Sequence, residues 1–152
     1  MIKVNVEINN KSWKETIKNP KKYLSSKLNK VSKIVPAFKT KKITFTILLT
    51  NSFNMKKLNK QFRKLNKPTD VLSFPFMSSR DFRSSKEENI YIGDIATSYE
   101  IIKNRAKKSN FYIEFDKVWI HGLLHLIGYD HIKNKDYLKM YKMEKKILNF
   151  IN

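Results

Sequence analysis

FYIEFDKVWIHGLLHLI, residues 111–127, is the most apolar helical stretch of the chain and the most informative about its architecture. In the second half of this stretch, apolar side chains occupy nearly every face of a helix. A helix that is apolar all round is normally buried in the centre of a domain. Gly128 follows, and glycine readily takes the left-handed conformation that ends a helix. We therefore expect a central buried helix around which the rest of the chain packs.

The segments on either side of this helix alternate between expected strands and expected helices. Alternation or β-branched residues predict the strands, and capping residues, Pro and apolar periodicity predict the helices. We expect strands at 2–8, 42–50, 71–74 and 90–97, helices at 12–34 (interrupted near Asn19-Pro20), 51–65, 98–108 and 134–150, and a loop at 77–89. Gly93 allows a bulge or a close backbone approach within its strand. The pattern predicts an α/β (α+β) fold, with one small mixed sheet packed with helices, and the length predicts a single domain spanning 1–152.

The chain is strongly basic, with 32 Lys and Arg against 13 Asp and Glu and a formal net charge of +19. Such a charge indicates an anionic partner, with nucleic acid first and a membrane surface second. Only four of the basic residues are Arg, and an A+T-rich genome also raises the Lys content. Charge alone therefore leaves nucleic-acid binding undecided.

The chain contains no cysteine, which excludes disulfides, thiolate metal ligands and a cysteine nucleophile. No apolar run approaches the roughly 18 residues that a membrane span needs. Residues 1–8 lack the basic region and apolar core of a secretory signal. We therefore expect a cytoplasmic protein that is neither exported nor inserted into a membrane.

All three histidines lie in one short segment, HGLLHLIGYDH, residues 121–131. At about 100° per residue, His121 and His125 differ by only about 40° around a helix axis and point the same way. The chain can turn back after Gly128 and bring His131 to the same ion. Three neutral imidazoles with an open fourth position are typical of a catalytic zinc site. The alternative, three buried core histidines without partners, would carry a large desolvation cost.

The spacing H-x-x-x-H-x-x-G-x-x-H also resembles the metal site of metzincin peptidases, with one departure. Those enzymes place a glutamate directly after the first histidine, as general base, where this chain has Gly122. Peptide hydrolysis needs a carboxylate to take a proton from the metal-bound water. The motif therefore favours a metal site and argues against a peptidase.

Three sequence blocks resemble the YbeY family of bacterial endoribonucleases in order and in spacing. They are HGLLHLIGYDH at 121–131, the pair LNKQFR at 58–63 and KPTDVLSFP at 67–75, and IGDI at 92–95. The resemblance spans roughly residues 40–150. It implies a single α/β domain that cleaves single-stranded RNA, matures the 3′ end of the small-subunit (16S) ribosomal RNA and takes part in ribosome quality control.

The resemblance also assigns roles to individual residues. It implies one zinc ion per chain, held by His121, His125 and His131, and it maps the functional arginine of the family onto Arg63. We expect no further cofactor. RNA of the small ribosomal subunit is the expected partner, and the oligomeric state stays open.

Arg63 suits phosphodiester cleavage on chemical grounds. The reaction builds negative charge on the non-bridging oxygens, which a divalent ion and a guanidinium stabilise. The planar fork of Arg63 can hold two phosphate oxygens. By charge alone, a solvated arginine on an amphipathic helix is the commoner interpretation. The nucleophile, a water or the RNA 2′-hydroxyl, stays open.

Several further residues have two interpretations each. Asp70, Asp94 and Asp130 either orient a ligand histidine or cap a turn. Thr69 is expected in a turn after Pro68, and Ser73 either touches RNA or is an ordinary strand residue.

Three aromatic residues outside the central helix also have two interpretations. Phe76, Phe82 and Tyr91 either stack on unpaired bases or belong to the core.

Three rival functions remain. The first is a zinc peptidase, against which Gly122 argues. The second is a non-catalytic ribosome assembly factor, in which zinc organises the fold and the basic surface docks on the ribosome. The third is a generic nucleic-acid-binding module, in which the histidine cluster would have no purpose. A peptide-cleavage assay tests the first. A folded His121→Ala protein separates the second from an RNA-cleaving enzyme, because the enzyme loses RNA cleavage whereas a scaffold loses only stability or docking.

Overall fold

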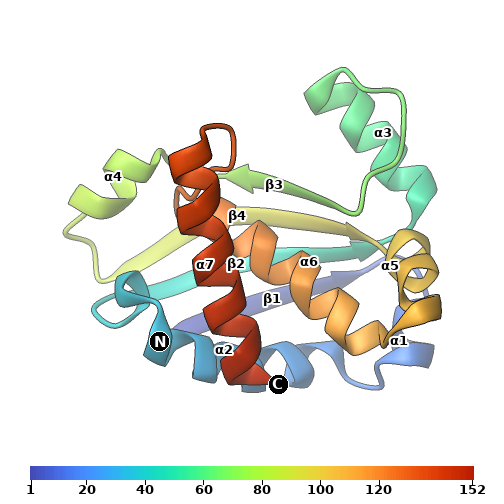
Figure 1. Cartoon of the computed structure of the whole chain (residues 1–152), viewed down its shortest axis with the longest axis horizontal. Coiled ribbons are helices and arrows are strands. Elements are labelled where there is room, and N and C mark those ends of the chain that lie inside the picture. Colours follow the sequence, from blue (N-terminus) through green and yellow to red (C-terminus); the bar gives the residue numbers. More distant parts are fainter.

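The computed structural model describes residues 1–152, and a four-stranded sheet with the order β1-β2-β4-β3 lies at its centre (Figure 1). β1, β2 and β4 are parallel, and β3 pairs with β4 as an antiparallel edge strand. The strands are β1 Ile2–Ile8, β2 Lys42–Thr50, β3 Val71–Pro75 and β4 Asn89–Ser98. The predicted mixed sheet and α/β fold class are therefore confirmed.

Most of the helices cover one face of this sheet (Figure 1). α6 lies against β3 and β4, α2 lies against β1, and α7 packs on both helices. α3 covers part of the opposite face, where Met55 packs with Leu72 and Ala96. The helices are α1 Ser12–Thr16, α2 Pro20–Ile34, α3 Ser52–Arg63, α4 Ser79–Ser84, α5 Tyr99–Arg105, α6 Phe111–Leu126 and α7 Asn134–Ile151, with 3-10 turns at Pro36–Phe38 and Ala106–Lys108.

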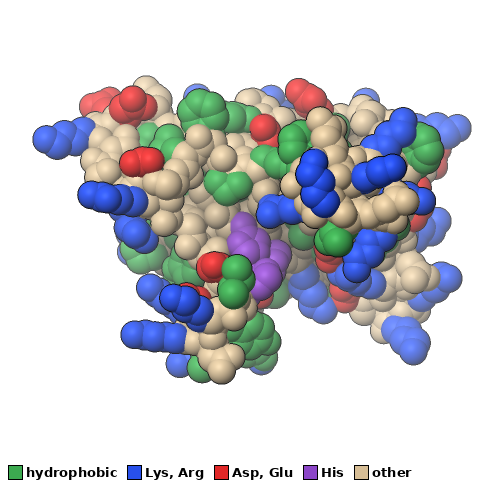
Figure 2. Space-filling model, turned by 90° about the horizontal axis from the view of Figure 1, so that it is seen from above, with side chains coloured by type: hydrophobic (Ala, Val, Ile, Leu, Met, Phe, Trp, Pro, Cys, Tyr) green, Lys and Arg blue, Asp and Glu red, His purple; other side chains and the backbone are tan.

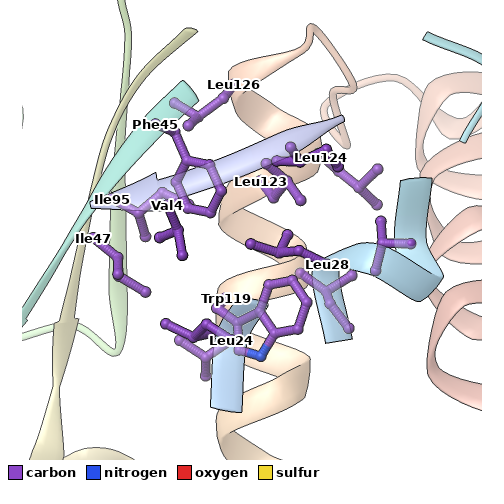
Figure 3. Close-up of a cluster of buried hydrophobic side chains, with 14 of the residues drawn as sticks. Val4, Leu24, Leu28, Phe45, Ile47, Ile95, Trp119, Leu123, Leu124 and Leu126 are labelled. Carbon is purple, nitrogen blue, oxygen red and sulfur yellow. The ribbon is translucent and has the colours of Figure 1, made fainter. Parts of the chain in front are cut away.

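α6 is the predicted central buried helix. It begins at Asn110, whose side chain accepts hydrogen bonds from the N–H groups of Tyr112 and Ile113. Trp119 and Leu123 are fully buried between the sheet and α2 (Figure 3). The helix ends before Gly128, which takes a positive φ of 96°, as the sequence predicted. A single apolar helix therefore contributes side chains to the core and also holds the first two histidines.

A buried carboxylate ties α6 to α2. Asp116 is fully buried and accepts hydrogen bonds from Trp119 Nε1 at 2.8 Å and from the Tyr23 hydroxyl at 2.9 Å. It also pairs with the Lys27 ammonium, which in turn donates to the side chain of Asn152 at 2.8 Å. Burial, reinforced by the Asp116 charge, raises the pKa of Tyr23, so this hydroxyl keeps its proton and remains a donor. Every polar group of the network is satisfied, which is what makes burial of the charge tolerable.

β4 bulges at Gly93, as its glycine predicted. The register against β2 shifts between Thr44 and Thr46, so that Ile92 and Gly93 together face one residue. Gly93 has a φ of 132°, and a Cβ there would lie 2.2 Å from the carbonyl oxygen of Phe74. Only glycine permits this close approach of β3 to β4.

The loop predicted at 77–89 is partly wrong, because it contains the short helix α4. Ser78 begins this helix by accepting a hydrogen bond from the N–H of Asp81 at 3.0 Å. Phe82 is its one buried anchor, at 2% exposure. Six residues hold too little apolar periodicity for a helix to be recognised. No helix in the structure combines the length and the apolarity needed to cross a bilayer.

Candidate metal centre

The structure brings the three histidines of the motif together in one hollow of the surface (Figure 2). His121 and His125 lie one turn apart on α6, with their Nε2 atoms 3.0 Å apart. His131 approaches from the turn after the helix, and one ligand atom from each residue lies within 4.8 Å of the others. The geometric part of the prediction, convergence of the three rings, therefore holds.

The Nδ1 atoms of two of these rings are held from behind. His121 Nδ1 lies 2.6 Å from Glu144 Oε1, on α7, and His125 Nδ1 lies 2.9 Å from the carbonyl oxygen of Tyr129. A carbonyl and a carboxylate accept hydrogen bonds, so both Nδ1 atoms carry the proton and donate. In the neutral form of each ring, the form that coordinates a metal, Nε2 is then a bare lone pair directed into the hollow.

Two lone pairs only 3.0 Å apart repel each other unless a cation lies between them. Burial, followed by the charges of His121 and His131, lowers the pKa of His125, so this imidazole is neutral and able to coordinate at neutral pH. Neutral imidazoles with Nδ1 fixed by a carboxylate or a carbonyl are the usual form of metal-binding histidine. The residues present therefore fit a bound divalent metal.

The turn that carries His131 is shaped by Asp130. Its Oδ1 accepts hydrogen bonds from the backbone N–H groups of His131 at 2.6 Å and of Ile132 at 3.2 Å. Of the two interpretations left open by the sequence, the structure therefore supports turn capping for Asp130.

The histidines line a cleft of about 670 Å³ that also reaches Arg63, at the end of α3. One Arg63 Nη donates to the carbonyl oxygen of Ser73 at 3.3 Å. This bond holds the guanidinium beside the edge strand β3, while its other N–H groups remain available. Arg63 and the histidines come from segments far apart in sequence, yet they share one cleft.

The free edge of β3 forms one wall of the cleft. The N–H of Phe76 donates to the carbonyl oxygen of Ile92 at 2.9 Å, and the N–H of Ser98 donates to the carbonyl oxygen of Asp70 at 3.0 Å. The backbone N–H and C=O groups of the even-numbered residues of β3 therefore point toward β4. The backbone groups of Ser73 therefore point to the open edge. Its N–H lies beside Arg63 as a second donor to the cleft.

Gly122 fills the position where a metzincin has its glutamate. It is buried, and a Cβ there would lie 3.0 Å from Ile95 and 3.2 Å from the Ser73 hydroxyl. That hydroxyl donates to the carbonyl oxygen of Gly122 at 3.0 Å, which ties β3 to α6. Ser73 therefore has a structural side chain, and any side chain at residue 122 would crowd Ile95 and the Ser73 hydroxyl.

The other acidic candidates do not bond the histidines. Asp70 accepts from the N–H of Val71 at 2.8 Å and pairs with Arg105, so it fixes the start of β3 at the rim of the cleft. Asp94 accepts from the Tyr91 hydroxyl at 2.5 Å on the opposite face of the sheet. Thr69 directly precedes Asp70, in the segment between α3 and β3, and lines the cleft.

The three aromatic candidates differ from one another. Phe82 is buried, so the stacking interpretation is wrong for it, whereas Phe76 is 70% exposed. The Phe76 ring meets the Tyr91 ring edge-on at 5.8 Å, on the side of β3 away from the histidines.

Sequence reasoning missed Glu144 and the Tyr129 carbonyl. Glu144 lies 23 residues after His121 on another helix, and only tertiary packing brings the two together. The one available signal was an acidic residue in the middle of a lysine-rich helix that has only one other acidic residue, Asp136. A backbone carbonyl leaves no signal in a sequence.

The family profile and the curated relatives that this chain matches carry the same description. The family profile described as Endoribonuclease YbeY matches residues 7–152. Endoribonuclease YbeY of Pelagibacter ubique is 47% identical over 99% of this chain and 97% of its own length. The protein of the same name from Ehrlichia canis is 34% identical over 98% of this chain and 92% of its own length.

A solved structure shows the same architecture. The solution structure of a Thermotoga maritima protein superposes with a TM-score of 0.62 at 28% identity, and covers 99% of this chain and 89% of its own.

Proposed function

Since the chain belongs to the YbeY family of endoribonucleases, we propose that it is a zinc-dependent endoribonuclease specific for single-stranded RNA. Membership gives the coarser statement, an RNA-cleaving hydrolase. The observation that carries zinc is the pair of bare imidazole nitrogens 3.0 Å apart, with a third imidazole beside them. We assign His121, His125 and His131 as the ligands and Arg63 as the catalytic residue.

The residues of the cleft divide the reaction between them. A bound zinc ion supplies Lewis-acid stabilisation of phosphoryl oxygens and lowers the pKa of a coordinated water. Arg63 holds the scissile phosphate with the N–H groups that Ser73 leaves free. The N–H of Ser73 donates to a second oxygen of the same phosphate, and neither donor has to reorganise as charge develops.

No carboxylate near the histidines is free to act as a general base. Glu144 is bonded to His121, and Asp130 caps its own turn. Either nucleophile, a water or the RNA 2′-hydroxyl, would have to give its proton to a base other than these two carboxylates. Products ending in a 2′,3′-cyclic phosphate would identify the 2′-hydroxyl as the nucleophile, and their strict absence would exclude it.

The finer biological role is proposed from the family resemblance. We propose that residues 1–152 form one catalytic domain that acts in the cytoplasm on ribosomal RNA of the small subunit. The reaction is maturation of the 16S RNA 3′ end, with a role in ribosome quality control. The net charge of +19 favours such a polyanionic substrate.

The peptidase alternative is disfavoured by two features of the cleft. Gly122 supplies no glutamate base, and a side chain there would crowd Ile95 and Ser73. The edge of β3 is also unable to add a peptide strand, because Asp70 occupies the N–H of Val71, Arg63 occupies the carbonyl of Ser73, and Pro75 has no N–H.

The assembly-factor alternative shares the metal and the charge, so only activity separates it. We would measure zinc content and cleavage of single-stranded RNA for untagged wild type, His125→Ala and Arg63→Lys, with Arg80→Lys as a control on an exposed arginine of α4. We expect about one zinc per chain in wild type and in both arginine variants, and a loss in His125→Ala. Arg63→Lys should cleave at least about tenfold more slowly than Arg80→Lys. Equal rates for the two arginine variants would argue against the role of Arg63. Undiminished cleavage by folded His125→Ala would argue against zinc-dependent catalysis, and no cleavage by zinc-loaded wild type would argue for a scaffold.

A further inference from the structure

A second groove of about 390 Å³ continues from the cleft along α7. The two hollows share Asp70, Val71 and His121 in their linings, so they meet at the histidine site. Tyr141 and Lys145 form the α7 wall of this second groove. A polymer that passes through the cleft therefore has a path open along α7.

Tyr141 of this wall and Tyr137, one helical turn before it on α7, form a row of two exposed tyrosines, in which only Tyr141 lines the groove itself. Tyr137 is 50% exposed and Tyr141 is 41% exposed, one helical turn apart. Their rings are nearly parallel, with an interplanar angle of 10° and centroids 6.1 Å apart. The ammonium of Lys145 lies 5.0 Å from the centre of the Tyr141 ring. The row therefore presents aromatic faces with a cation at its end, which is the composition of a stacking surface for unpaired bases.

Two of the three acidic residues in the groove are balanced by a cation, since Asp70 pairs with Arg105 and Glu114 pairs with Lys117 at 2.9 Å. The third, Glu144, bonds the imidazole of His121. No salt bridge engages Lys145, so its charge is available to a phosphate.

We propose that single-stranded RNA leaves the cleft along this groove, with Tyr137 and Tyr141 stacking on unpaired bases and Lys145 contacting the backbone. The inference rests on the proposed endoribonuclease function and extends it by assigning a substrate path outside the cleft. Stacking on tyrosine needs unpaired bases, so the groove would also contribute to the preference for single strands. The affinity for RNA that is too short to reach α7 should not depend on the two tyrosines.

The test is the affinity of labelled single-stranded RNAs by fluorescence anisotropy, on full-length zinc-loaded protein, with 2′-O-methyl phosphorothioate RNA so that the RNA stays intact. For RNA of about ten nucleotides, Tyr137→Ala/Tyr141→Ala should bind at least about tenfold more weakly than wild type, whereas RNA of about three nucleotides should bind equally to both. Tyr137→Phe/Tyr141→Phe should restore binding, because phenylalanine keeps the ring.

Two matched controls lie on the same helix. Phe150 is 51% exposed on another flank of α7, so Phe150→Ala should leave RNA affinity unchanged. Lys145→Ala should lower the salt dependence of binding, and Lys146→Ala, its neighbour on another flank, should not. Far-ultraviolet circular dichroism checks that each variant is folded.

The proposal is overturned if the double alanine variant binds the longer RNA as tightly as wild type, or if Phe150→Ala weakens binding equally. It is also overturned if duplex RNA loses the same affinity as single strands. Because this assay needs no cleavage, these outcomes are separate from the zinc and RNase measurements that test the proposed function.

Discussion

Glu144 orients His121 from a different helix, and at the scale of single residues it is the contact with the clearest consequence. The carboxylate, 2.6 Å from Nδ1, fixes the tautomer that leaves Nε2 bare. We expect Glu144→Gln to weaken zinc binding about 10- to 100-fold, because loss of such a contact to a ligand histidine has that effect. Competition with a chromophoric chelator measures the affinity.

Glu114→Gln is the matched control for this prediction. Glu114 lines the same groove and carries the same charge, but it bonds Lys117 and Ser109 instead of a histidine. Equal zinc affinities for the two glutamine variants would show that Glu144 acts only through its charge.

At the same scale, Gly93 is required by the backbone conformation where β3 approaches β4, and it has no part in the histidine site. Gly93→Ala forces a Cβ into the Phe74 carbonyl, at a φ of 132° that L-residues rarely adopt. We expect the free energy of unfolding to fall by more than about 2 kcal/mol. Urea denaturation measures it, and Asn89→Ala, at the exposed start of the same strand, should change it little. A stability equal to wild type would mean that β3 shifts away from β4 at small cost.

Secondary structure was predictable wherever a segment carried its own pattern. β2 is rich in β-branched residues and alternates over most of its length, and α6 is apolar enough to be recognised as central. α4 was missed because it has only one buried anchor. The histidines were predictable because one helix and one turn hold them, whereas Glu144 and the tyrosine row depend on how α7 packs. The spacing of residues within one helix or turn can be read from a sequence, whereas the packing of one helix on another cannot.

At the scale of elements, the fully buried Asp116 joins α6 to α2 through an ion pair with Lys27, whose side chain is only 15% exposed, and through two neutral donors. We expect Asp116→Ala to lower the free energy of unfolding by about 3–5 kcal/mol, because it leaves the Lys27 ammonium without its partner. Chemical denaturation measures this change.

Glu114→Ala provides the comparison on the same helix. Its pair with Lys117 lies at the surface, where the lysine side chain is 52% exposed, and such pairs contribute about 0–1 kcal/mol. A similar loss for both variants would mean that the buried network stabilises no more than a surface pair.

For the whole molecule, the net charge of +19 predicts RNA binding that weakens steeply with salt. If about four phosphates are contacted, the logarithm of the association constant should fall with a slope near −3 against the logarithm of the salt concentration. That slope corresponds to a loss of roughly 50-fold between about 50 and 200 mM salt. Anisotropy titrations across this range measure the slope, and a flat profile would contradict an electrostatic contribution to binding.

The placement of α7 has a consequence for how the protein is made. Ribosomes synthesise chains from the N-terminus, so α7 emerges after every strand and after the helix that carries His121 and His125. α7 supplies Glu144 behind His121, and its buried Ile147 and Ile151 join the core cluster that includes the apolar residues of α2. While the nascent chain lacks α7, the core is incomplete and His121 has no carboxylate behind it. The core and the histidine site of this RNA-cleaving enzyme are therefore complete only after α7 has emerged from the ribosome.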